Sequence, residues 1–160
     1  MENHLETINR PMHLIIRFSD SFIKSSTTIV EHQKIIDEYG FVWFGKMGHP
    51  ILESRSELLN LQVKKHVPTF VFLAKGNRNK YNVYQAKLEL SSRIMPENEQ
   101  YLIPDYYSSF ELFKHIRFWV KLNEIKEVEF SILAQYKVIR SAYSIKESLV
   151  KSSSGHFFIN

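Results

Sequence analysis

The segment that decides the fold runs from residue 28 to residue 46 and reads TIVEHQKIIDEYGFVWFGK. Thr28 and Glu31 have the spacing of a capping box at the start of a helix. Apolar residues then recur at helical spacing, and Gly40 stands at the left-handed position where helices commonly end. These signals predict a helix over residues 28–39.

The last part of this segment, residues 41–46, predicts a short strand. Trp43 and Phe44 point to opposite faces of such a strand, because successive side chains alternate. Both faces are apolar, which is typical of a strand that is covered on both sides. We therefore expect this strand to lie inside the sheet, between two neighbours.

Outward from this segment, strands and helices alternate. Residues 12–18 have the period of two that is typical of a strand with one face in the core. Residues 52–65 predict a second helix, which ends before Pro68 because proline disfavours its continuation. Residues 69–75 and 81–90 predict the two strands of a hairpin.

The remaining signals are shorter. They are a helical turn with Phe110, Leu112 and Phe113, a strand over 117–122, a helix over 130–136, a capping box at Ser144 and Glu147, and a strand over 156–159. The order favours an α+β fold over a doubly wound parallel sheet, in which strands and helices keep alternating. We expect one domain over residues 1–160, with a small curved mixed sheet or β-barrel flanked by helices.

The composition limits the possible classes of protein. The chain has 160 residues, of which 44% are hydrophobic and 24% charged, as in ordinary globular proteins. It has no cysteine, which excludes thiolate chemistry, iron–sulfur clusters and disulfides and fits a reducing compartment. The first residues are polar, unlike a secretory signal, and no apolar run approaches the roughly 18 residues of a spanning helix. We expect a cytoplasmic protein without a membrane partner.

The net charge of +4 is unevenly distributed. Residues 61–95 hold seven basic residues and one acidic residue, so their charge of +6 exceeds that of the whole chain. Lys75, Arg78 and Lys80 lie at the hairpin turn, where such a cluster would attract a polyanion through counterion release. These three residues are candidates for contacts with a nucleic-acid backbone. The alternative is an ordinary solvated loop.

No catalytic or metal-binding motif is recognisable. The seven histidines have no zinc-like spacing, and the five glycines form no phosphate-binding loop. A nucleophile elbow is also missing, although a dispersed Ser-His-Asp triad leaves no local pattern. We therefore expect no metal, no cofactor and no catalytic residue.

Aromatic residues make up 14% of the chain, more than a core of this size requires. The candidates for a ligand pocket, together with two polar residues after the first strand, are Trp43, Tyr106, Tyr107, Trp119, Ser19 and Asp20. Such rings stack on planar bases, with a gain of about 1 to 3 kcal/mol per base. The polar pair would hydrogen-bond a base edge. The alternatives are core packing for the rings and a turn or helix cap for Ser19 and Asp20.

Four stretches together resemble the PUA-like superfamily, and within it the EVE and YTH type of domain. They are TIVEH at 28–32, YGFVWFGK at 39–46, IPDYY at 103–107, and the serine-rich segment before FFI at 157–159. The resemblance spans most of the chain, through short motifs. It implies a small curved or barrel-like sheet flanked by helices, which binds nucleic acid by holding one modified base, often flipped from a duplex, in an aromatic pocket.

Carried over onto this chain, the resemblance makes Trp43 the first pocket ring, Tyr106 or Tyr107 the opposite wall, and Lys46 a contact to a nearby phosphate. No motif fixes the second ring, for which Trp119 is the candidate. Some such domains in bacteria and archaea are reading modules of modification-dependent restriction systems. The resemblance therefore implies methylated DNA as the favoured partner, with an AAA+ motor or a nuclease, fused or separate, as the source of any activity.

Three other functions fit the same residues. An RNA-binding member of the superfamily would share the rings and the basic hairpin but read 2′-hydroxyl groups. A protein-interaction module would present exposed rings, such as Phe44, Tyr106, Phe157 and Phe158, to a partner. A small enzyme that acts on a nucleotide would show turnover with a bell-shaped pH profile.

Overall fold

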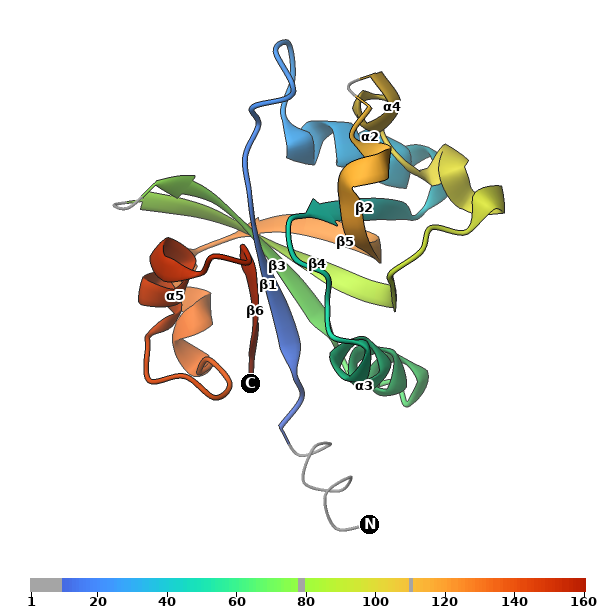
Figure 1. The fold of residues 1–160 in the computed structure, drawn as a ribbon. Coiled ribbons are helices and arrows are strands. Elements are labelled where there is room, and N and C mark those ends of the chain that lie inside the picture. Colours follow the sequence, from blue (N-terminus) through green and yellow to red (C-terminus); the bar gives the residue numbers. More distant parts are fainter. Residues whose placement is uncertain (1–9, 78–79, 110) are drawn as a thin grey trace.

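The computed structural model describes residues 10–77, 80–109 and 111–160, which form a curled mixed sheet with helices around it (Figure 1). The strands are β1 (His13–Phe18), β2 (Val42–Met47), β3 (Phe70–Asn77), β4 (Lys80–Ser92), β5 (Ile116–Val128) and β6 (His156–Ile159). The α-helices are α2 (Thr28–Tyr39), α3 (Glu53–Lys64), α4 (Tyr106–Ser109) and α5 (Ile145–Lys151), and the 3-10 helices are η1 (Glu97–Leu102), η2 (Phe113–His115) and η3 (Phe130–Gln135). The α+β class and the curved mixed sheet expected from the sequence are confirmed.

The described strands form one sheet in the order β2-β5-β4-β3-β1-β6. Neighbours are antiparallel except β1 and β3, which run parallel. β1 and β2 are separated by three strands in this order, yet the ring centroids of Phe18 on β1 and Phe44 on β2 lie only 6.1 Å apart. The curl of the sheet therefore brings the ends of these two strands around one concave space.

Helix α2 has the predicted limits, but its N-terminus is capped differently. The N-cap is Thr27, whose hydroxyl accepts a hydrogen bond from the first turn, so the predicted box of Thr28 and Glu31 does not form. Thr28 is the first helical residue, and its N–H donates to the carboxylate of Asp20 at 2.8 Å. Gly40 ends the helix with φ at 87°, a left-handed conformation that glycine adopts without strain.

Strand β2 lies at an edge of the sheet, so the expectation of an internal strand is wrong. Both of its faces are nevertheless buried. Phe44 packs in the cluster that α2 covers, and Trp43 packs on the other face with residues of η1, α4 and η2. Helices cover the two faces of this strand, while only β5 pairs with it along an edge. An apolar pattern reports buried faces and does not show whether both edges are paired.

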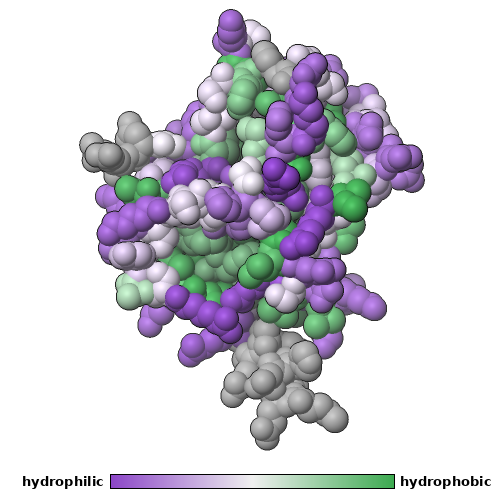
Figure 2. Space-filling model, viewed as in Figure 1, coloured by the Kyte–Doolittle hydropathy of each residue, from purple (hydrophilic) through white to green (hydrophobic). Residues whose placement is uncertain are grey.

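The side of the sheet opposite α2 is covered by η3 and α5. Ile15 and Phe72 of the sheet form one cluster there with Leu149 of α5. Helix α5 begins with the predicted capping box, in which Ser144 and Glu147 each bond the backbone of the other. In the view of Figure 2, hydrophobic residues gather in a hollow in the part of the face where Figure 1 places α5 and β6.

Candidate functional site

A cavity opens between the ends of β1 and β2, beside α4 and the segment that precedes α2, and we call it the aromatic cavity. Its volume is about 380 Å³. The residues that line it are Arg17, Phe18, Ser19, Phe22, Ile23, Thr28, Phe44, Gly45, Lys46, Met47, Gly76, Tyr106, Tyr107, Leu112 and Ile116. No carboxylate occurs among these described residues. Apolar walls with a few polar groups are typical of pockets that bind planar organic ligands.

Four residues that the sequence predicts as site residues line this cavity: Ser19, Tyr106, Tyr107 and Lys46. The rings of Tyr106 and Tyr107 stack with centroids 4.5 Å apart and planes 23° apart. Burial raises the pKa of Tyr106 to about 12, so its hydroxyl stays protonated at neutral pH. The structure thus brings the two tyrosines and Lys46 to one space, although they lie about 60 residues apart in the chain.

Sequence reasoning missed most of the apolar wall. Phe18 is the last residue of β1, and Phe44 lies two residues before Lys46 on β2, so Phe44 and Lys46 share a face of the strand. Because Lys46 was already a candidate, its position on the same face of the strand was the signal that could have identified Phe44 as a lining residue. Phe22 and Ile23 come from the loop before α2, where no periodicity indicates which side chains turn inward.

Tyr107 is fixed by a chain of buried hydrogen bonds. Nδ1 of His32 lies 2.7 Å from the carbonyl oxygen of Thr28, and it donates this bond because a carbonyl only accepts. Nε2 of His32 therefore accepts from the Tyr107 hydroxyl at 3.0 Å, and the same hydroxyl accepts the N–H of Gly45 at 2.9 Å. Burial lowers the pKa of His32 to about 4, which keeps the ring neutral as this chain requires. The chain joins α2, α4 and β2 behind the cavity.

Trp43 and Trp119 do not line the aromatic cavity. Trp43 is fully buried on the face of β2 opposite Phe44, so the structure does not place it where a cage ring is needed. Trp119 is also buried, with its ring 5.3 Å from that of Tyr107, and a Cβ on Gly45 would come within 2.8 Å of it. Trp119 therefore supports the cavity wall from behind.

Asp20 does not line the cavity either. Its carboxylate accepts the N–H of Thr28 and forms an ion pair with Lys75 at 2.6 Å. Burial acts to raise the pKa of Asp20, but the hydrogen bonds from Lys75 and Thr28 outweigh it and hold the pKa below its usual value. Asp20 thus has the helix-cap role that was its alternative, and Lys75 is occupied by the same ion pair.

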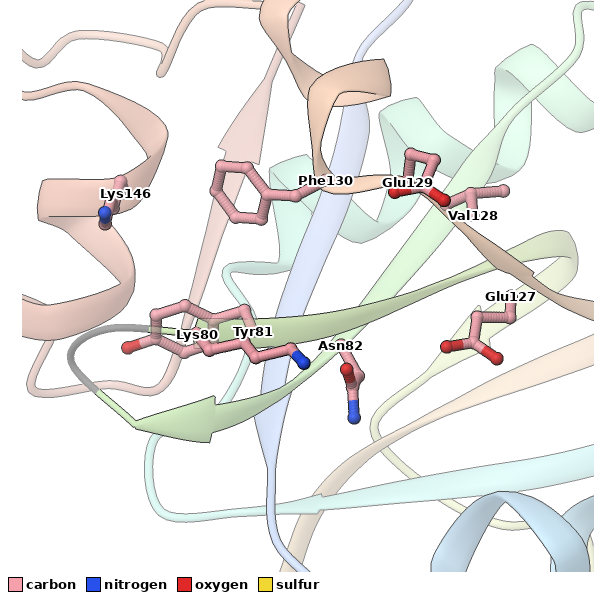
Figure 3. Close-up of a pocket in the computed structure, with 8 residues that line it drawn as sticks. All are labelled: Lys80, Tyr81, Asn82, Glu127, Val128, Glu129, Phe130 and Lys146. Atoms are coloured by element: carbon pink, nitrogen blue, oxygen red, sulfur yellow. The ribbon is translucent and has the colours of Figure 1, made fainter.

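A second cavity, of about 750 Å³, lies where the start of β4 meets the end of β5 and α5, and we call it the hairpin cavity (Figure 3). Lys80, a predicted backbone contact, lines this cavity and not the aromatic one. Figure 3 shows the carboxylates of Glu127 and Glu129 on the opposite side of the space from Lys146. Arg78, the third predicted hairpin contact, lies outside the described residues.

The described part of the chain has neither a cluster of metal ligands nor a membrane-spanning helix. No group of three His, Asp or Glu side chains there is arranged to hold a metal ion. No helix in the same residues has the length and hydropathy that crossing a bilayer requires.

The fold is that of a small α+β domain with a largely aromatic cavity at the ends of two strands. A family model described as Pua-like matches residues 14–155, and the chain belongs to this family. Domains of this family often bind nucleic acids. Searches among curated proteins and among solved structures found no match. The family match confirms the resemblance at the level of the PUA-like superfamily, and the EVE and YTH type stays a prediction.

Proposed function

We propose that the aromatic cavity holds a single base of a nucleic acid and that the chain reads a methylated base in DNA. A cavity of about 380 Å³ is large enough for one base. A base inside a duplex reaches such a pocket only after it has been flipped out of the stack. Membership of the Pua-like family supports nucleic acid as the ligand class.

The observation that carries this proposal is the composition of the cavity wall. Stacked Tyr106 and Tyr107 face a space that Phe18 and Phe44 also line, with no carboxylate among the described lining residues. Aromatic walls suit the flat faces of a base, and the lack of acidic groups suits a ligand that is attached to phosphate.

The energies are consistent with a reading function. Flipping a base costs a few kcal/mol in lost stacking and pairing, and ring contacts return about 1 to 3 kcal/mol per base. A buried methyl group adds about 0.8 kcal/mol, which corresponds to an affinity difference of about fourfold. Larger discrimination arises if the unmethylated base leaves a polar group unpaired in the cavity. The base-reading preference therefore depends on the apolar wall.

The proposed role needs no cofactor and no catalytic residue in this chain. A reading domain of this kind supplies specificity to a partner that acts on DNA. We propose that a motor or nuclease, fused or separate, provides the activity, as in a modification-dependent restriction system.

The test is a binding titration with short labelled duplexes that carry one methylated adenine, one methylated cytosine or no modification, with RNA duplexes of the same sequence in parallel. Tyr106→Ala removes a ring of the cavity, and Tyr143→Ala is the matched control because its half-exposed ring lies elsewhere. We expect one methylated duplex to bind best and Tyr106→Ala to weaken it by about tenfold or more, in line with the loss of one stacking contact.

Other outcomes separate the alternatives. Preference for RNA would replace the DNA assignment with RNA recognition by 2′-hydroxyl contacts. Equal binding of all duplexes by the wild type and Tyr106→Ala would overturn base reading. No binding at low salt would favour a protein partner, although Phe44, one of the rings considered for such a surface, is buried.

A further inference from the structure

Two cations that line the aromatic cavity have no acidic partner in the part of the chain that the structure describes. The ammonium of Lys46 donates to the backbone carbonyl of Met47 at 2.6 Å. The guanidinium of Arg17 donates to the carbonyls of Leu149 and Ser152, at 2.5 and 3.0 Å. None of the ion pairs found among the described residues includes Lys46 or Arg17. Both charges are therefore compensated by neutral carbonyls alone.

The two cationic groups meet at Gly155. A Cβ built on this residue would lie 2.9 Å from Nζ of Lys46 and 3.9 Å from a terminal nitrogen of Arg17. Gly155 has φ at 72°, and Gly48, also left-handed with φ at 93°, would place a Cβ 3.6 Å from the same Nζ. A side chain at Gly155 would therefore crowd the ammonium of Lys46, and one at Gly48 would touch it.

The environment of Lys46 disfavours an isolated positive charge. Its side chain is half-buried, and burial together with the charge of Arg17 lowers the pKa of Lys46. The charge of Lys46 in turn helps to lower the pKa of His156, whose buried Nδ1 has no hydrogen-bond partner among the described residues. An anion beside Lys46 and Arg17 would offset the repulsion between these two cations.

The hairpin cations have different surroundings. Lys75 is paired with Asp20, Lys87 is paired with Glu124, and Lys80 shares its cavity with two glutamates. Lys75 and Lys87 therefore already have acidic partners, and a phosphate near Lys80 would meet two carboxylates in the same cavity. At the aromatic cavity, by contrast, no carboxylate occurs among the described lining residues.

We infer that Lys46 and Arg17, beside Gly155, form a phosphate subsite of the aromatic cavity, which binds the phosphate attached to the nucleotide whose base lies among the rings. This inference rests on the proposed function for the base, and it adds Arg17 to Lys46, so that two cations at the ends of β1 and β2 hold one phosphate. The recognised unit is then a nucleotide and not a base alone.

The experiment follows the affinity for a short DNA duplex with one methylated adenine as a function of salt. Lys46→Met removes the charge with little change in volume, Lys46→Arg keeps it, and Lys80→Met is the matched control in the hairpin cavity. We expect Lys46→Met to weaken binding by about tenfold at low salt and to lower the slope of log affinity against log salt by about 1. Lys46→Arg and Lys80→Met retain most of the affinity.

Urea unfolding shows whether the variant folds. Lys46→Met loses a charge that Arg17 repels and the hydrogen bond to the carbonyl of Met47, but no ion pair, so its midpoint of urea unfolding should stay close to that of the wild type. A binding loss with full stability is the signature of a ligand contact. Equal slopes for the wild type and Lys46→Met, or a larger loss in Lys80→Met, would overturn the subsite.

Inorganic phosphate, followed by NMR, separates this inference from the proposed function. If phosphate shifts the amide signal of Gly155 in the wild type but not in Lys46→Met, while no duplex binds, the subsite stands and nucleic-acid reading fails. If duplexes bind in a base-dependent way and neither phosphate nor Lys46→Met has an effect, the reading function stands and the subsite fails.

Discussion

The aromatic cavity and the hairpin cavity both contain cations, but they differ in what compensates them. In the hairpin cavity, Lys80 and Lys146 share the space with two glutamates (Figure 3). In the aromatic cavity, Lys46 and Arg17 face rings and backbone carbonyls. The larger of the two cavities is therefore the weaker candidate for an anionic ligand. The neighbours of a charge, and not the size of the space or the charge of a sequence window, decide what it can bind.

The largest expected effect is the loss of stability in acid, which comes from three buried histidines, two of them on the side of the aromatic cavity. Burial lowers the pKa of His13, His32 and His156 from 6.5 to about 4. Between these pH values the unfolded chain binds more protons than the folded one, so stability is full above about pH 6.5 and is lost as the pH falls toward 4. A fully buried histidine contributes up to about 3 kcal/mol to this loss.

Urea unfolding at a series of pH values measures this loss. His32 and His156 lie at the aromatic side, and no histidine lines the hairpin cavity among the described residues. The decline should begin above the range in which exposed carboxylates titrate. A free energy of unfolding that stays constant between pH 6.5 and 5 would contradict the neutral, buried state of these rings.

The next prediction compares the loss of stability when one tyrosine hydroxyl is removed at each cavity. Tyr107→Phe leaves Nε2 of His32 and the N–H of Gly45 without partners, which should cost about 2 to 4 kcal/mol. Tyr81→Phe is the matched change in the hairpin cavity, where no described residue hydrogen-bonds the Tyr81 hydroxyl, and it should change the stability by less than about 0.5 kcal/mol. Thermal or urea unfolding measures both. Equal effects would mean that the Tyr107 chain does not stabilise its cavity.

The smallest effect concerns a paired hairpin cation. Lys75→Met breaks the partly exposed ion pair with Asp20 and should lower the stability by about 1 kcal/mol or less. The salt dependence of nucleic-acid binding should stay as in the wild type, because this charge already has a partner. If the salt slope fell as much as expected for Lys46→Met, Lys75 would contact the nucleic acid to the same extent as Lys46. That result would contradict the difference between the two regions.

Local signals in the sequence predicted the ends of several elements well. The strand over residues 156–159 and the capping box at Ser144 are confirmed, because alternation and caps depend only on near neighbours. Strand β5 extends six residues past its predicted end at Leu122. Residues of this polar extension pair with β4, as Val128 does with Val83, and backbone hydrogen bonding of this kind needs no apolar pattern.

The candidate site was only partly predictable, because it depends on contacts between distant segments. The sequence identified Tyr106 and Lys46 as candidates, but it could not show which face of β2 meets the end of β1. That choice excludes Trp43 from the cavity and includes Phe44. Arg17 gave no signal as a site residue, since its place beside Lys46 arises from the curl of the sheet.

The hydrogen-bonded chain from Thr28 through His32 and Tyr107 to Gly45 has a consequence for the thermodynamics of recognition. Its bonds are internal to the protein, so they hold the wall in place whether or not a base is bound. A preorganised wall loses little conformational entropy on binding. The free energy gained from contacts with the base is therefore available to distinguish one base from another, because little of it is needed to order the protein.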